Sequence, residues 1–176
     1  MIKEIEHINA CIVKSLAEAK KSAKAKLYGL AESVAVRGDE DTTIPAIILP
    51  DGECLNVYSE ADKHDVTLYH RLGNISFSDN QNASFGSAKG YDESADMTLL
   101  VYGKRAKISP YRMEQLARKV IAETENCTLV GSDFNSLQVF ANEYMGVTYF
   151  LTPAYFLFKI NYRITSTYNA RCANIE

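Results

Sequence analysis

Residues 155–167 read Tyr-Phe-Leu-Phe-Lys-Ile-Asn-Tyr-Arg-Ile-Thr-Ser-Thr and alternate along their length between two kinds of side chain. One set of alternate positions is apolar throughout: Phe156, Phe158, Ile160, Tyr162 and Ile164. The intervening positions include Lys159, Asn161 and Arg163. Because successive side chains of a strand point to opposite faces, this stretch predicts a long β-strand with one face in a core and the other mostly in water.

Shorter stretches with strand-like composition lie on the N-terminal side of this strand. Apolar runs at 44–49 and 54–58 flank Pro50-Asp51-Gly52, whose proline and glycine favour a tight turn, so they predict a β-hairpin. The remaining apolar or alternating runs predict further strands at 66–77, 97–102, 126–130, 136–144 and 147–168, the last of which contains the opening stretch.

Two segments have the spacing of helices. In the first, Ile5, Ile8 and Ile12 begin an apolar stripe that continues to Leu30 and predicts a helix over residues 1–30. At 1.5 Å per residue such a helix would run about 40 Å, so part of it should reach past its own domain. The second helix is predicted over 111–123, because Ser109 suits the N-cap and Pro110 the first helical position.

Residues 78–96 are almost all small, polar or glycine, and they predict a long extended loop. We expect contacts with neighbouring chains to hold such a loop. The order of elements then predicts one α+β domain over residues 1–176. Its core, at 44–168, would be a mostly antiparallel sheet packed against the long N-terminal helix and the second, amphipathic helix.

Composition excludes several classes of protein. Hydrophobic residues make up 47% of the 176 positions and charged residues 23%, which is ordinary globular usage and excludes wholesale disorder. With a net charge of −3, the chain is not expected to bind nucleic acid nonspecifically through a basic surface. This charge does not exclude DNA that passes nearby. No run approaches the ~18 apolar residues of a membrane helix, so no membrane contact is expected. The charged N-terminus predicts no signal peptide, and hence a cytoplasmic origin.

Motifs for catalysis, cofactors or metals do not emerge. The four cysteines are far apart and predict reduced thiols. His64 and His70 would lie about 20 Å apart along a strand, too far to share one metal ion. Residues 86–90 match a phosphate loop in composition but not in order, and no nucleophile elbow is present. We therefore expect no catalytic residue, no cofactor and no metal.

Two groups of residues are candidates for contacts between subunits. On the predicted N-terminal helix, Lys14, Lys21 and Lys24 share one flank, which is either a solvated face or a docking surface for an acidic neighbour. On the predicted loop, the candidates are Asn80, Asn82, Phe85, Lys89 and Tyr91.

The order of elements over residues 44–167 resembles the tail-terminator and tail-completion proteins of tailed bacteriophages. The resemblance rests on the hairpin, the extended polar loop, the strand Met97-Thr-Leu-Leu-Val-Tyr102 leading into an amphipathic helix, and the closing strands that end Phe158-Lys-Ile-Asn-Tyr-Arg-Ile-Thr165. The chain differs in its longer N-terminal helix and in the 78–96 insertion.

This resemblance implies a non-enzymatic structural virion protein that forms part of a ring around the DNA channel at the head–tail junction. It implies neck, portal or tail proteins as partners, and a place in the virion after synthesis in the bacterial cytoplasm. A soluble bacterial α+β binding or accessory protein is the alternative, and a small enzyme is a further one, for which the sequence offers no catalytic pair.

Overall fold

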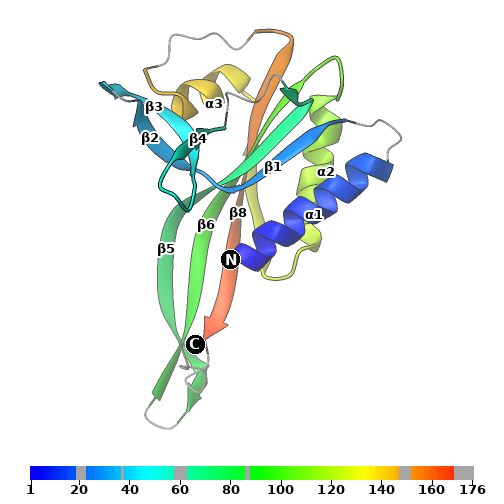
Figure 1. Ribbon diagram of the computed structural model, residues 1–176. Coiled ribbons are helices and arrows are strands. Elements are labelled where there is room, and N and C mark those ends of the chain that lie inside the picture. The colour runs from blue at the N-terminus through cyan, green and yellow to red at the C-terminus, as the bar shows by residue number, and fades with distance from the viewer. Residues whose placement is uncertain (19–22, 37, 58–62, 86–87, 147–151, 169–176) are drawn as a thin grey trace.

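The computed structural model describes residues 1–18, 23–36, 38–57, 63–85, 88–146 and 152–168, and Figure 1 shows the arrangement of their elements. The helices are α1 (Ile2–Glu18), α2 (Pro110–Glu123) and α3 (Ser136–Glu143). The strands are β1 (Ala25–Leu30), β2 (Glu32–Val36), β3 (Asp39–Ile48), β4 (Cys54–Asn56), β5 (Val66–Phe85), β6 (Ala88–Lys104), β7 (Cys127–Asp133) and β8 (Tyr155–Tyr168).

Two sheets are formed by these strands. The larger has the order β1-β5-β6-β8-β7, in which only β1 and β5 run parallel. The smaller is the antiparallel sheet β2-β3-β4, and its β3–β4 pair is the hairpin predicted around Pro50-Asp51-Gly52. The predicted α+β class, with a mostly antiparallel sheet, is therefore confirmed.

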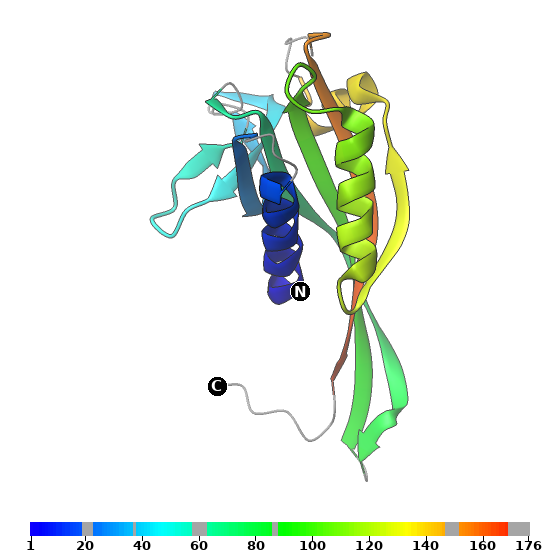
Figure 2. The ribbon, with the colours of Figure 1, turned by 90° about the vertical axis from the view of Figure 1, so that its right-hand side faces the viewer.

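The first core lies between the large sheet and helices α1 and α2. The alternating face of β8 predicted from sequence lines this core, with Phe156, Phe158, Ile160, Tyr162 and Ile164 all buried. Opposite it, α1 buries Ile5, Ile8, Ile12 and Leu16, and α2 buries Met113, Ala117, Val120 and Ile121. Both apolar helix faces thus cover one face of the sheet, as Figure 2 shows.

A second core covers the opposite face of the same sheet, where the sequence predicted mostly water. Leu157 of β8, Tyr69 of β5 and Leu100 of β6 are buried there against α3 and the small sheet. The interpretation of that face as mostly wet is wrong for its first half, because α3 and the three short strands add a third layer. Further along β8, Arg163 on that face is exposed.

The predicted N-terminal helix over 1–30 is too long. The helix α1 ends at Glu18, residues 19–22 lie outside the described part, and residues 25–30 form β1. Leu27 continues the helical spacing in sequence, yet it pairs with Leu68 in a strand. The sheet needs an edge strand beside β5, and that tertiary pairing overrides the local helical period.

Residues 136–144, predicted as a strand, form the helix α3 and its C-cap. Asn135 caps the helix by accepting a hydrogen bond from the backbone N–H of Gln138. The side chains that pack on the second core, Val139, Phe140 and Tyr144, include an i, i+4 pair and so share one helix face. The final strand begins at Tyr155, and residues 147–151, which the prediction assigned to it, are not among those described.

Candidate interaction surfaces

The segment predicted as a long loop, residues 78–96, is instead a β-hairpin that extends from the body of the molecule. β5 contains 20 residues and β6 contains 17, and they pair with each other from Val66–Gly103 out to Phe85–Ala88. A 20-residue strand spans about 66 Å at 3.3 Å per residue, which exceeds the width of a small domain. The segment predicted as an extended loop is therefore formed by paired strands.

We call the projecting part the arm, defined as residues 73–94 together with 165–168 of β8. In Figures 1 and 2 it continues past the ends of α1 and α2. The pairing of β1 with β5 reaches only to His70, and that of β7 with β8 only to Ile164. Among the described residues, the outer edge of β5 therefore has no strand partner along the arm.

One face of the arm carries exposed apolar side chains, and the register places Asp79 and Glu93 among them. Register places Ile75 opposite Ala95, and Ala95 opposite Ile164, so this face continues the one that lines the first core. Phe77, also on this face, is 65% exposed. The apolar arm face consists of Ile75, Phe77, Tyr91 and Tyr168 of the arm together with the adjoining Leu72, each with at least 39% of its surface exposed.

Aromatic contacts join the three strands of the arm on this face. The rings of Phe77 and Tyr91 meet edge to face at 5.8 Å, and those of Tyr91 and Tyr168 stack at 4.9 Å. Burial, followed by the nearby Glu93 carboxylate, raises the pKa of Tyr168. The three rings form a row across the arm that a partner could cover as one surface.

The opposite face of the arm is polar and satisfied within the chain. The Asp92 carboxylate accepts hydrogen bonds from the Thr167 hydroxyl at 2.6 Å and from the Asn80 amide at 2.9 Å. These two bonds, that from Thr167 foremost, lower the pKa of Asp92. Asp96 and Arg163 form an ion pair at 2.8 Å nearer the body. The arm is thus amphipathic, with one face suited to water and one suited to a partner.

The arm is closed at its tip by contacts of its own residues. Asn80 Oδ1 accepts hydrogen bonds from the backbone N–H groups of Asn82 and Ala83, and Gly90 N–H donates to the Ser84 hydroxyl at 2.9 Å. A Cβ at Gly90 would lie 2.4 Å from Ala83 backbone, so this close crossing requires glycine. These hydrogen bonds come from the hairpin itself, and the expected contact of the segment with neighbouring chains stays a prediction.

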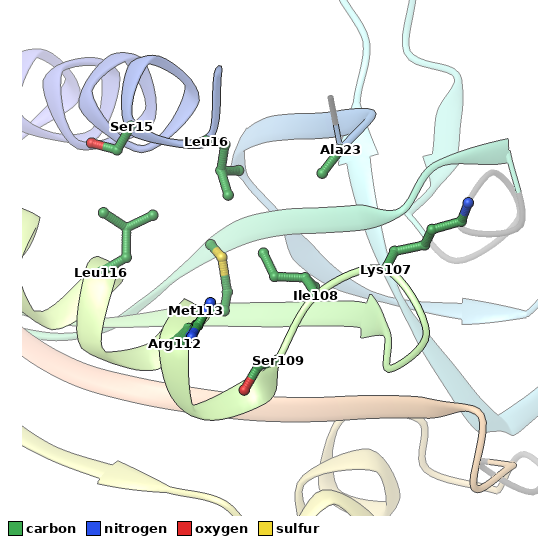
Figure 3. A pocket seen from close by; sticks show the side chains of 9 residues that line it. All are labelled: Ser15, Leu16, Ala23, Lys107, Ile108, Ser109, Arg112, Met113 and Leu116. Carbon is green, nitrogen blue, oxygen red and sulfur yellow. The ribbon is translucent and has the colours of Figure 1, made fainter. Parts of the chain in front are cut away.

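A cavity of about 300 Å³ lies between α1 and the start of α2. Leu16, Ile108, Met113 and Leu116 provide apolar side chains, and Figure 3 shows them around the hollow. Lys107 and Arg112 add positive charge to its lining. This composition suits a ligand or side chain that combines an apolar part with an acid.

A second cavity, of about 190 Å³, lies on the other side of the same helix start and is mainly aromatic. Tyr111, which is 73% exposed, stacks on Phe134 at 5.6 Å, and Phe134 stacks on the buried Phe158 at 5.2 Å. The other residues of the lining are Arg105, Pro110, Ser136 and Phe156. We call this the aromatic cavity.

Both cavities border the basic turn, defined as residues 104–112. This segment contains Lys104, Arg105, Lys107 and Arg112 and no acidic residue. Arg105 is held in place by a hydrogen bond from its Nε to the Tyr155 carbonyl at 3.0 Å, and its guanidinium lies 6.0 Å from the Phe156 ring. The turn therefore presents fixed positive charge beside an aromatic hollow.

A buried polar network connects α1 to the large sheet. The Asn9 amide nitrogen donates to the Tyr28 carbonyl at 3.1 Å, which directs its oxygen to His70 Nε2 at the same distance. Nε2 must therefore carry the proton, and Nδ1 accepts from the Tyr162 hydroxyl at 2.8 Å. Burial lowers the pKa of His70 to about 4 and raises that of Tyr162. His70 is a neutral structural residue here.

The predicted contact residues fall into two groups. Asn80, Asn82, Lys89 and Tyr91 all lie on the arm, and Tyr91 belongs to its apolar face. Lys14 and Lys24 do not share a helix flank, because Lys24 lies beyond the end of α1 and its backbone bonds to Asp65. Lys21 and the side chain of Phe85 lie outside the described part. Sequence reasoning missed Phe77, Tyr168 and the basic turn. The signals present in the sequence were the apolar–polar alternation of residues 75–77 and the four cations without an acid in residues 104–112.

Within the described ranges, no group of three or more His, Cys, Asp or Glu residues could hold a metal ion. The three cysteines placed there, Cys11, Cys54 and Cys127, are free thiols. None of the helices described has the length and apolarity needed to cross a membrane. Comparison with known proteins found no matching family and no matching curated protein.

Proposed function

We propose that this chain is a non-enzymatic structural subunit of a ring at the head–tail junction of a tailed bacteriophage. The observation that carries the proposal is the arm, in which the apolar face of the core continues outside the body without a cover. Exposed apolar surface of this kind marks sites of association. The element order that resembles tail-terminator and tail-completion proteins supports this class of assembly.

The expected partners are other copies of the chain and the neck, portal or tail proteins beside them. The arm carries Asp79, Asp92 and Glu93 against Lys89 alone, so it would repel DNA phosphates. DNA in the channel would therefore pass the arm without being bound. The protein would act in the virion, after synthesis in the host cytoplasm.

The alternative function is that of a soluble bacterial binding or accessory protein. One observation favours it, namely the cavity between α1 and α2, whose apolar lining and two cations suit a small amphipathic acid. Such a protein would work as a monomer or dimer, so the state of assembly separates the two functions.

Native mass spectrometry of the purified chain tests the proposal. We expect a closed ring of one copy number in exchange with the monomer. Phe77→Ser should shift this equilibrium toward the monomer by about tenfold or more, since exposed aromatic anchors commonly contribute above 1.4 kcal/mol. Ile48→Ser is the matched control, because Ile48 is also an exposed apolar strand residue, at 45%, but lies off the arm.

A monomer or a simple dimer at every concentration would contradict the ring proposal. Equal weakening by Phe77→Ser and Ile48→Ser would also count against it, because the arm would then have no special part in association.

A further inference from the structure

The arm and the basic turn lie at opposite ends of the long sheet. Phe77 pairs with Glu93 on β6, and Lys104 ends the same strand 11 residues later. Eleven residues of strand span about 36 Å, so the arm cannot reach the basic turn of its own chain. Figure 2 shows the arm extending away from the start of α2. Any contact between these two surfaces must join two copies.

The two surfaces are complementary in charge. The arm has three acidic residues and one lysine, whereas the basic turn has four cations and no acid. Asp79 is 75% exposed, and its partner Lys89 is 79% exposed at 3.5 Å, so their ion pair leaves the carboxylate accessible. Opposite charge at opposite ends of one chain favours head-to-tail contact and disfavours contact between two arms.

The two surfaces also match in the kind of apolar group they present. Among the described side chains of the arm, the most exposed apolar one is Phe77, and the aromatic cavity is built mainly from rings. Aromatic side chains prefer offset or edge-to-face contacts with other rings, and the stacked rings of Tyr111 and Phe134 line the cavity where such a contact can form. Arg105 at its margin lies where it can meet a carboxylate of the arm.

We propose that the apolar arm face of one copy docks on the basic turn of a second copy, with Phe77 entering the aromatic cavity and Asp79 facing the cations beside it. This inference rests on the proposed function and specifies the contact by which copies associate. Each copy donates one arm and receives one, so the interface is heterologous. Such an interface closes into a ring when its rotation allows.

Photo-crosslinking tests the contact directly. The full chain is prepared with p-benzoylphenylalanine in place of Phe77, irradiated at its highest soluble concentration and digested for mass spectrometry. We expect intermolecular crosslinks from position 77 to residues 105–136. The same probe at Ile48 should give no crosslinks to that region.

Charge reversal provides a second test. Asp79→Lys and Arg112→Glu should each weaken association about threefold, as expected for an exposed ion pair. The double variant should recover much of this loss, because every head-to-tail interface pairs the arm of one copy with the turn of the next. An interface between two arms would show no recovery with this pair.

The possible failures are distinguishable. Crosslinks from position 77 to another surface of a second copy would overturn the docking site while leaving the ring proposal intact. Absence of any intermolecular crosslink would overturn the docking site alone if native mass spectrometry shows a ring, and both proposals if it shows only a monomer. If a short DNA duplex binds the chain, protects the basic turn and loses affinity with Arg112→Glu, while the crosslinks avoid that turn, the turn is a phosphate site and the inference is wrong.

Discussion

At the scale of single residues, His70 shows how a buried histidine can serve structure. It joins Asn9 of α1 to Tyr162 of β8, and Asn9 in turn bonds to the backbone of β1. Both ring nitrogens are occupied, one as donor and one as acceptor. Protonation would place a positive charge in a site with no water-exposed surface, so burial favours the neutral ring.

This network predicts a loss of stability at mildly acidic pH. The pKa of His70 is about 4 in the folded chain, below the value of 6.5 for the free side chain. Because the unfolded state binds the proton more readily, the neutral His70 ring stabilises the folded chain fully above pH 6.5. This stabilisation is lost as the pH falls toward 4. The loss should reach about 3 kcal/mol at the lower limit.

Urea unfolding across this pH range, for the wild type and for His70→Gln, measures the effect. The difference between the two unfolding free energies at each pH excludes the effect of the carboxylates, which both proteins share. Parallel curves would show that His70 is not the group whose titration links folding to pH.

At the scale of elements, the arm is a hairpin whose own hydrogen bonds suffice for its shape and whose apolar face still lacks a cover. Its packing differs from that of the body, since few of its side chains contact either core. Elements with few buried contacts add little to global stability. Removal of the outer arm should therefore leave the chain folded but prevent its association.

Shortening the arm tests this expectation. Replacement of residues 77–93 by Asn-Gly removes Phe77, Asp79 and Tyr91, keeps Ser76 opposite Ser94 and supplies the turn that a two-residue hairpin prefers. We expect a nearly unchanged thermal midpoint together with loss of association. As a control, Asp51→Asn gives the hairpin of β3 and β4 the same Asn-Gly turn, and it should leave the thermal midpoint and the association unchanged.

A large fall in the midpoint of the shortened chain would instead show that the arm is part of the folding unit. The apolar arm face would then be explained by stability of the chain itself.

At the scale of the whole molecule, the two ends of the large sheet differ in charge and shape, which gives the chain a direction. A negative amphipathic arm lies at one end and a positive aromatic hollow at the other. A head-to-tail contact between them combines burial of apolar surface with attraction of opposite charge. The charged part alone is sensitive to salt, because ions screen exposed charges over about 10 Å at 0.1 M ionic strength.

Association should therefore weaken severalfold when salt is raised from low to physiological concentration, and then level off as the apolar contact remains. Sedimentation equilibrium over a salt series measures this dependence. The Asp79→Lys variant should show a flatter response. Association that strengthens steadily with salt would indicate an interface without opposed charges.

The amino-acid sequence by itself determined the parts of the fold that local periodicity controls. The alternation of β8, the stripe from Ile5 to Leu16 and the cap and proline at the start of α2 all lie where their spacing predicts. Each is a short-range pattern carried by a few neighbouring residues.

Tertiary structure decided the rest, through strand pairing between segments far apart in sequence. Leu27 kept the helical period yet joined the sheet, and the polar run 78–96 became strands because most of β5 pairs with β6, with register shifts at 72–75 and 80–85. The same pairing carried Phe77 and Tyr91 out along the arm, while the chain reversal at the other end of β6 placed Arg105 beside Phe134. Residues far apart in sequence become neighbours only through sheet register, which short-range periodicity does not encode.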